Sequence, residues 1–236
     1  MSLDIAKIRA DTPGVEKVAH FNNAGASLMP TPVLDVQIEH LKLEASIGGY
    51  EAAAAAAVRC EAVYASVSKL IHADVDEVAL VENATVAWDM AFYSLPFDEG
   101  DRILTSEAEY AANYIAYLHV AKRTGVVVES IPCANSGEVD TKALEDMIDD
   151  RVKLISITHI PTNGGLVNPA SEIGRIAKTN NITYLLDACQ SVGQLPIDVD
   201  ELGCDILSAT GRKYLRGPRG TGFLFVRKSL LATLEP

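Results

Sequence analysis

Short apolar runs alternate with longer helix-like segments along most of the chain. The runs that predict strands are residues 77–81, 102–105, 126–131, 153–159, 182–187, 205–209 and 221–227. Several are continuously apolar, which is typical of strands buried on both faces of a sheet. The segments that predict helices are residues 32–46, 51–73, 84–94, 108–123, 141–150 and 170–178. This alternation predicts an α/β fold, a three-layer α/β/α sandwich around a mostly parallel, seven-stranded sheet.

Composition narrows the class of protein. The chain has 236 residues, of which 48% are hydrophobic, so it can bury enough surface to fold. No apolar run approaches the ~20 residues of a membrane helix, and the N-terminus lacks the features of a signal peptide. The net charge of −12 disfavours nucleic acid and anionic membranes as partners. We therefore expect a cytoplasmic metabolic protein.

Cysteine and histidine spacing predicts no metal site. The four cysteines lie far apart with no C-x-x-C pair, a pattern that fits neither a zinc site nor a disulfide framework. The five histidines show no spacing typical of metal ligands either. We expect Cys189 and Cys204, which lie next to predicted strands, to be structural thiols. His159, at a strand end, is expected to pack in the core.

Polar clusters follow five of the predicted strands. In parallel α/β sheets, ligands bind beyond the carboxyl ends of the strands, so these clusters are expected to share one edge. They are residues 82–85, 109–110, 161–165, 187–190 and 210–213. Each has an ordinary structural explanation taken alone: a helix cap, a loop-capping carboxylate or a solvated lysine. The combination is much rarer than its parts.

Together these clusters contain what pyridoxal 5′-phosphate requires. Its phosphate needs amides, hydroxyls and a cation, and a helix N-terminus supplies the amides. Its ring needs a stacking partner and a carboxylate at the pyridinium nitrogen, and its aldehyde needs a lysine. A nicotinamide site is disfavoured, because the glycine-rich residues 216–222 spell G-x-x-G-x-G rather than G-x-G-x-x-G.

Two segments carry a resemblance to a known family. Residues 185–194, Leu-Leu-Asp-Ala-Cys-Gln-Ser-Val-Gly-Gln, resemble the strand-end Asp-x-x-Gln motif of the class V aminotransferases. Residues 208–222, which contain Thr-Gly-Arg-Lys-Tyr, resemble the Schiff-base lysine loop of that family. The similarity runs from about residue 20 to residue 228 and implies the large-domain fold of a pyridoxal-phosphate-dependent transferase.

The resemblance implies a role for each matching residue. Lys213 would form the Schiff base, and Asp187 would pair with the pyridinium nitrogen; both would be catalytic. Gln190 would hydrogen-bond the 3-oxygen of the ring. The remaining cofactor-binding positions are Ala84, Thr85, Thr210 and Arg212 around the phosphate, Tyr110 as the stacking ring, and Thr162 near the ring. The segment Asn22, Asn23, Ala24 and Gly25 resembles the substrate-side loop of the family.

Departures from the family pattern leave the reaction open. Tyr110 stands where cysteine desulfurases have a histidine, and Thr162 stands where many relatives have an asparagine. The lysine loop is more similar to that of the epimerase and ergothioneine-lyase branch than to that of the desulfurases that supply iron–sulfur clusters. We favour an enzyme that acts on an α-amino acid by C–S cleavage, as cysteine desulfurases and selenocysteine lyases do. The alternatives are an aminotransferase, an epimerase similar to isopenicillin N epimerase, or a cofactor-binding domain without turnover.

The resemblance also implies a domain organisation and a partner. Residues 1–19 would form an N-terminal arm and residues 20–230 the large, pyridoxal-phosphate-binding domain. Residues 231–236 would begin a smaller C-terminal domain, which in relatives carries the substrate-binding arginine and, in desulfurases, the nucleophilic cysteine. Enzymes of this fold type build their sites at a homodimer interface, so we expect a homodimer.

Overall fold

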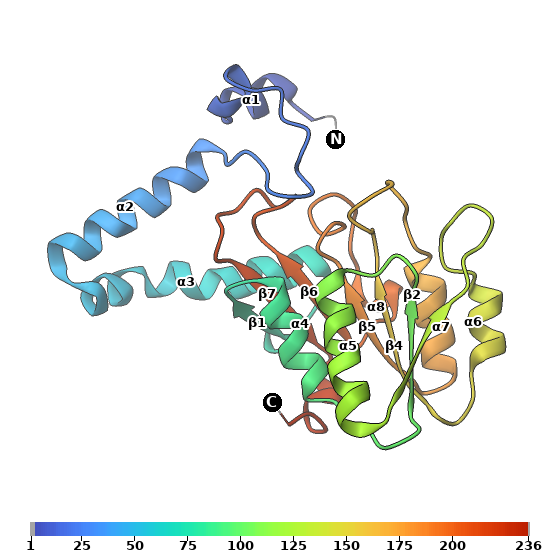
Figure 1. The fold of residues 1–236 in the computed structure, drawn as a ribbon. Helices are drawn as coiled ribbons and strands as arrows, with labels where there is room; N and C mark the ends of the chain where they lie inside the picture. The colour runs from blue at the N-terminus through green and yellow to red at the C-terminus, as the bar shows by residue number, and fades with distance from the viewer. Residues whose placement is uncertain (1–2, 236) are drawn as a thin grey trace.

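A computed structural model describes residues 3–235, which form a layered α/β body with a helical arm (Figure 1). The strands are β1 (Val78–Val81), β2 (Arg102–Ser106), β3 (Val127–Ile131), β4 (Val152–Thr158), β5 (Thr183–Asp187), β6 (Ile206–Thr210) and β7 (Gly222–Val226). The helices are α1 (Ile5–Ala10), α2 (Thr31–Ile47), α3 (Gly49–Ile71), α4 (Ala84–Tyr93), α5 (Ala111–Thr124), α6 (Thr141–Met147), α7 (Ala170–Thr179), α8 (Val199–Leu202) and α9 (Lys228–Leu231), with 3₁₀ turns η1 (Pro13–Glu16) and η2 (Val75–Glu77).

The seven strands form one sheet in the order β1-β7-β6-β5-β4-β2-β3. The five strands from β6 to β3 run parallel, so their carboxyl ends share one edge. Strand β7 is antiparallel to both of its neighbours, β6 and β1. Gly222 begins β7 and pairs with Val81 on one side and Thr210 on the other. This pairing brings the residues after β1 to the same edge as the residues after β6.

Alternate strand residues separate two apolar cores. Leu154, Leu185 and Ile206 face α4 and α5 on one side of the sheet. Their neighbours in sequence, such as Ile155 and Leu186, face the other side, which α6, α7 and α8 cover. This period of two residues is that of a pleated strand buried on both faces. The predicted three-layer sandwich with a mostly parallel, seven-stranded sheet is therefore confirmed (Figure 1).

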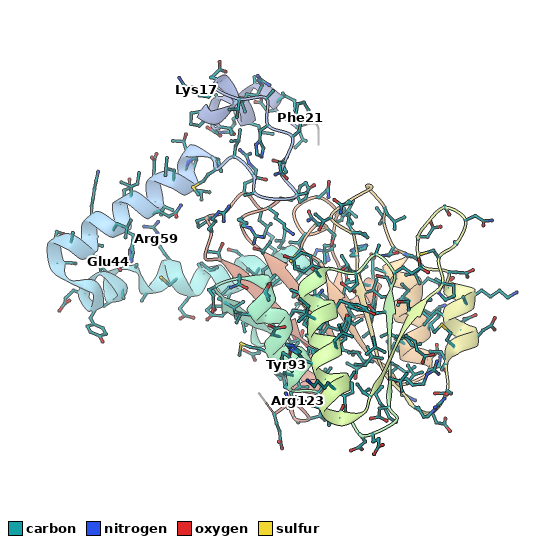
Figure 2. All side chains as sticks on the ribbon, in the orientation of Figure 1. Lys17, Phe21, Glu44, Arg59, Tyr93 and Arg123 are labelled. Atoms are coloured by element: carbon teal, nitrogen blue, oxygen red, sulfur yellow. The ribbon has the colours of Figure 1, made fainter. Side chains whose placement is uncertain are left out.

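Helices α2 and α3 project from the body as a hairpin (Figure 1). Gly48 joins them at φ 96°, a backbone conformation that favours glycine. Helix α2 has no buried residue, whereas α3 buries Ala52, Ala56 and Ile71. Figure 2 shows Glu44 and Arg59 on the two helices of this arm, well away from the sheet. Most of the arm is therefore surface.

Each predicted strand and helix has a counterpart, but some bounds differ. The helix expected from residue 108 begins at Ala111, because Tyr110 is extended at φ −71°, ψ 133° and its amide bonds the Glu109 carboxylate. The helix expected to reach residue 150 ends at Met147, since Ile148 is already extended. The short helices α1 and α8 were not predicted. Among residues 3–235, no helix combines the length and apolar character needed to cross a membrane.

Candidate active site

A cavity opens at the carboxyl edge of the parallel strands, where the polar clusters meet. It is bounded by the start of α4, the start of α5, the ends of β4 and β5, and the loop between β6 and β7. The side chains and backbone that line it are Asn83, Ala84, Thr85, Tyr110, Asn113, Thr158, Thr162, Asp187, Cys189, Gln190, Arg212 and Lys213. Such an edge is where open α/β sheets bind ligands.

One end of the cavity is suited to an anion. The Asn83 side chain caps α4 by accepting from the Val86 amide at 2.9 Å. The first turn of a helix leaves its amides without intrahelical acceptors, and the helix dipole adds positive potential there. Arg212 lines the same cavity, and its Nη1 donates to Thr210 Oγ1 at 2.9 Å. The amides of Ala84 and Thr85, the hydroxyl of Thr210 and a guanidinium thus form one anion-binding group.

Gly222 allows this close approach. A Cβ at this position would lie 2.8 Å from the carbonyl carbon of Asn83 and 2.9 Å from the oxygen of Ala209. Both contacts are with backbone, which cannot rotate away. The absence of a side chain on Gly222 therefore lets the turn before α4 lie directly against the end of β6.

Lys213 is a buried amine in the loop after β6. The residue is 7% exposed, and its Nζ lies 6.0 Å from the centre of the Tyr110 ring. Within the described part of the chain, no ion pair includes Lys213. A turn in which the Arg216 amide donates to the Lys213 carbonyl at 3.0 Å fixes the backbone around it. Lysine without an ion pair is available for covalent chemistry.

Asp187 ends β5 and enters the cavity from the floor. It is 5% exposed, and its Oδ1 accepts from the Cys189 amide at 2.9 Å. Its Oδ2 accepts from Asn113 Nδ2 at 3.1 Å. Two donors hold the carboxylate in one orientation, as expected for a group that must face a fixed ligand atom.

A second carboxylate, Glu109, lies behind Asp187 and is partly buried. It accepts from the hydroxyls of Thr105 and Thr158, from the Tyr110 amide and from Asn113 Nδ2. Burial, together with the nearby charge of Asp187, raises the pKa of Glu109 to about 7. The site therefore contains one carboxyl group that changes its charge near neutral pH.

The loop of residues 22–27, which precedes α2, covers part of the site. Gln190 Nε2 donates to the carbonyl of Ala24 at 3.2 Å, and the Ser27 amide donates to the carbonyl of Arg212 at 2.9 Å. Of the four predicted substrate-side residues, Ala24 contacts Gln190, which lines the cavity. The Asn22 side chain accepts from the amide of Gly25 within its own turn, whereas Asn23 lines a separate hollow beside α1.

The structure gathers most of the predicted cofactor-binding residues. Eight of them line the cavity: Ala84, Thr85, Tyr110, Thr162, Asp187, Gln190, Arg212 and Lys213. Thr210 lies next to it through its bond to Arg212. Asn83, Glu109 and Cys189 lie in the predicted polar clusters without an assigned role, whereas Asn113 and Thr158 were missed by the sequence analysis.

Cys189 and Cys204, the two cysteines expected to be structural, are poorly suited to act as nucleophiles. All four are free thiols, and Cys204 is completely buried. Burial raises the pKa of the Cys204 thiol to about 12. Burial and the neighbouring Asp187 also raise the pKa of Cys189 well above its usual value. Both thiols are therefore protonated at neutral pH, whereas a nucleophile needs the thiolate.

Comparison with known proteins gives the family. The family model for aminotransferase class-V matches residues 19–236. A "Probable cysteine desulfurase" of Methanothermobacter thermautotrophicus is 31% identical over 232 residues, which cover 97% of this chain and 58% of that protein. The cysteine desulfurase of Yersinia pestis is 30% identical, covering 100% of this chain and 61% of its own length. The apo structure of a Thermococcus onnurineus cysteine desulfurase has a TM-score of 0.91 at 27% identity, covering 100% of this chain and 60% of that one.

The chain belongs to the class V aminotransferase family. It spans about three fifths of the length of the relatives that it matches.

Proposed function

We propose that this chain forms the cofactor-binding part of a pyridoxal-phosphate-dependent enzyme that cleaves the C–S bond of cysteine. The observation that carries the proposal is the buried Lys213 amine, which shares one cavity with an aromatic ring and a fixed carboxylate. The names of the curated relatives, which are cysteine desulfurases, support cysteine as the substrate.

The donors and acceptors in the cavity fit pyridoxal phosphate. The anion-binding group at the start of α4 suits a phosphate. Asp187 offers a carboxylate to a pyridinium nitrogen, and the Tyr110 ring offers a face for stacking. Gln190 Oε1 is buried and lacks a hydrogen-bond partner among the described residues, so a polar contact is still to be made there. Each part of the cofactor therefore has a chemically matched residue.

The residues of this chain have separable tasks in that reaction. Bound pyridoxal phosphate supplies an electron sink for the bonds at the α-carbon of an amino acid. Lys213 would hold the aldehyde and, as a free amine, would accept a proton from the α-carbon of the substrate. Asp187 would pair with the protonated ring nitrogen. The start of α4 and Arg212 would hold the phosphate, and Tyr110 would offer its face to the ring.

An absorbance titration tests cofactor binding. We expect a visible band on addition of pyridoxal phosphate, and borohydride reduction should fix the cofactor mass on the peptide that contains Lys213. The Lys213→Ala variant should lose both signals. Lys122→Ala is the matched control, because this lysine of α5 is exposed. A wild-type protein that gives no band with excess cofactor would contradict the proposal.

Product analysis with cysteine tests the reaction. C–S cleavage should give alanine, together with sulfide when dithiothreitol is present. Pyruvate formed with ammonia and sulfide would also be C–S cleavage, by β-elimination. Formation of 3-mercaptopyruvate, which keeps the C–S bond, would indicate amino transfer instead, and formation of D-cysteine would indicate epimerisation. If the cofactor is bound but none of these products forms, the chain is a cofactor-binding domain without turnover.

We further propose a homodimer that works in the cytoplasm. The helical arm of α2 and α3 carries exposed apolar side chains, among them Leu41 at 63%, Tyr50 at 92% and Val58 at 85% exposure. An apolar surface of this kind is typical of an interface between subunits, and the family builds its sites between two copies. Four free cysteines suit a reducing compartment.

A further inference from the structure

One amide joins two carboxylates beneath the proposed cofactor site. Asn113 Nδ2 lies 3.1 Å from Glu109 Oε1 and 3.1 Å from Asp187 Oδ2. A side-chain amide nitrogen carries two protons, so each proton serves one carboxylate. Asn113 is 2% exposed, which leaves water little access to replace either bond.

We propose that Glu109 is a positioning residue for Asp187 and acts through the Asn113 amide that both carboxylates share. The inference rests on the proposed function, because the orientation of Asp187 matters to catalysis only when it faces a cofactor. With Glu109 as acceptor, the Asn113 nitrogen stays turned toward both acids. Without it, the amide can rotate and present its oxygen to Asp187, which would repel the carboxylate.

The remaining contacts of Glu109 come from neutral groups. Thr105 on β2 and Thr158 on β4 are hydroxyls that can donate or accept, and Tyr110 contributes a backbone amide. The titratable groups around Glu109 are Asp187 on β5 and the buried phenol of Tyr117 on α5.

A proton on Glu109 is therefore easily accommodated. Burial raises the pKa of the Tyr117 phenol well above its usual value, so that group stays neutral. Below pH 7 Glu109 is a neutral acid that can donate to a threonine hydroxyl and still accept from Asn113. Above its pKa of about 7, Glu109 carries a negative charge close to the Asp187 side chain. The electrostatic environment of Asp187 therefore changes near neutral pH.

The side-chain amide of Asn113 reports the protonation of Glu109 directly, without any cofactor. In ¹H–¹⁵N spectra of the apoprotein, we expect the Asn113 amide signals to shift between pH 5 and 9 with a midpoint near the Glu109 pKa of about 7. The Asn113→Ser variant assigns these signals. In Glu109→Gln the shift should vanish, whereas Glu107→Gln, which changes an exposed residue nearby, should retain it. Asn113 amide signals that do not shift with pH, or that shift equally in Glu109→Gln, would overturn the inference.

Cofactor affinity gives the second measurement. Glu109→Ala removes the acceptor and should weaken pyridoxal phosphate binding about tenfold, the size of one hydrogen bond to a charged group. Glu109→Gln keeps an acceptor oxygen and should restore most of the affinity while removing the change in affinity that is centred near pH 7. Equal losses in both variants would contradict positioning through the amide. If the wild type binds no cofactor but its Asn113 amide signals shift with a midpoint near pH 7, the proposed function fails, whereas the coupling between Glu109 and Asp187 through Asn113 is supported.

Discussion

At the scale of single residues, His159 shows how burial at the carboxyl edge of the sheet disfavours the charged form of a side chain. His159 follows β4, and its amide donates to the carbonyl of Asp187 at 2.9 Å. The side chain is 6% exposed, and its Nδ1 has no hydrogen-bond partner among the described residues. Burial lowers the pKa of His159 from 6.5 to about 4. The imidazole is therefore neutral in the folded protein at neutral pH, consistent with the packing role expected for it.

The first prediction concerns stability and pH. Between pH 4 and 6.5 the unfolded chain binds a proton at His159 that the folded protein does not, so stability rises with pH across this window. The shift corresponds to a contribution of about 3 kcal/mol. Urea unfolding should show that wild type gains this much more than His159→Gln from pH 4 to 7, whereas His119→Gln, at an exposed position, should follow wild type. Parallel curves for wild type and His159→Gln would refute the assignment.

The sequence predicted the residues with distinctive chemistry better than the residues that orient them. Asp187 and Lys213 follow strands within recognisable motifs, and the structure places both in one cavity. Glu109 lay in one of the predicted polar clusters without a role, and Asn113 lay in none of them. Their contacts depend on where α5 begins and on how it lies against β4 and β5, which are long-range properties of the fold.

At the scale of elements, two helical glycines differ in what surrounds them. A Cβ on Gly174 in α7 would lie 2.0 Å from the carbonyl oxygen of Leu202 at the end of α8. A Cβ on Gly49, the first residue of α3, would have no neighbour within 4 Å. The same substitution therefore acts on packing at one site and on helix propensity alone at the other.

The second prediction follows from this contrast. Gly174→Ala should lower the free energy of unfolding by about 2 to 3 kcal/mol or more, because backbone must move to admit the methyl group. Gly49→Ala should be neutral or stabilising by up to about 1 kcal/mol, since alanine favours a helix. Chemical denaturation of the two variants measures both effects. Equal effects would show that α7 and α8 can separate without cost.

Strands were easier to predict than their order. Short runs with apolar centres identified each strand, because β2, β5 and β6 are almost completely buried. The short helix α8 lacked a periodic apolar pattern long enough to detect. The place of β7 between β1 and β6 depends on pairing with residues 140 or so positions away, which local sequence does not encode.

At the scale of the whole molecule, the body and the arm differ in how they bury apolar surface. The body has a core on each face of the sheet, whereas α2 contributes no buried residue. Phe21, in the segment between η1 and α2, is 95% exposed (Figure 2). These surfaces are the ones that we assign to the second subunit.

The third prediction tests that assignment. Sedimentation should show a dimer for the wild type and a monomer for the double variant Leu41→Glu, Val58→Glu, because charges within an apolar interface remain unpaired. Leu118→Glu, on the exposed face of α5, is the control and should leave the dimer intact. If the wild type is a monomer at every concentration tested, or if the double variant remains a dimer, the arm is not the interface.

The position of β7 has a consequence for the order of events during synthesis. The ribosome makes β1 and α4 early and β7 last among the strands, yet Gly222 of β7 is the residue that pairs with Val81 and lies against Asn83. Helix α4 also packs on β6, but its first turn can lie against the end of β6 only because Gly222 has no side chain. A nascent chain therefore completes the anion-binding end of the cavity only after the ribosome has made β7.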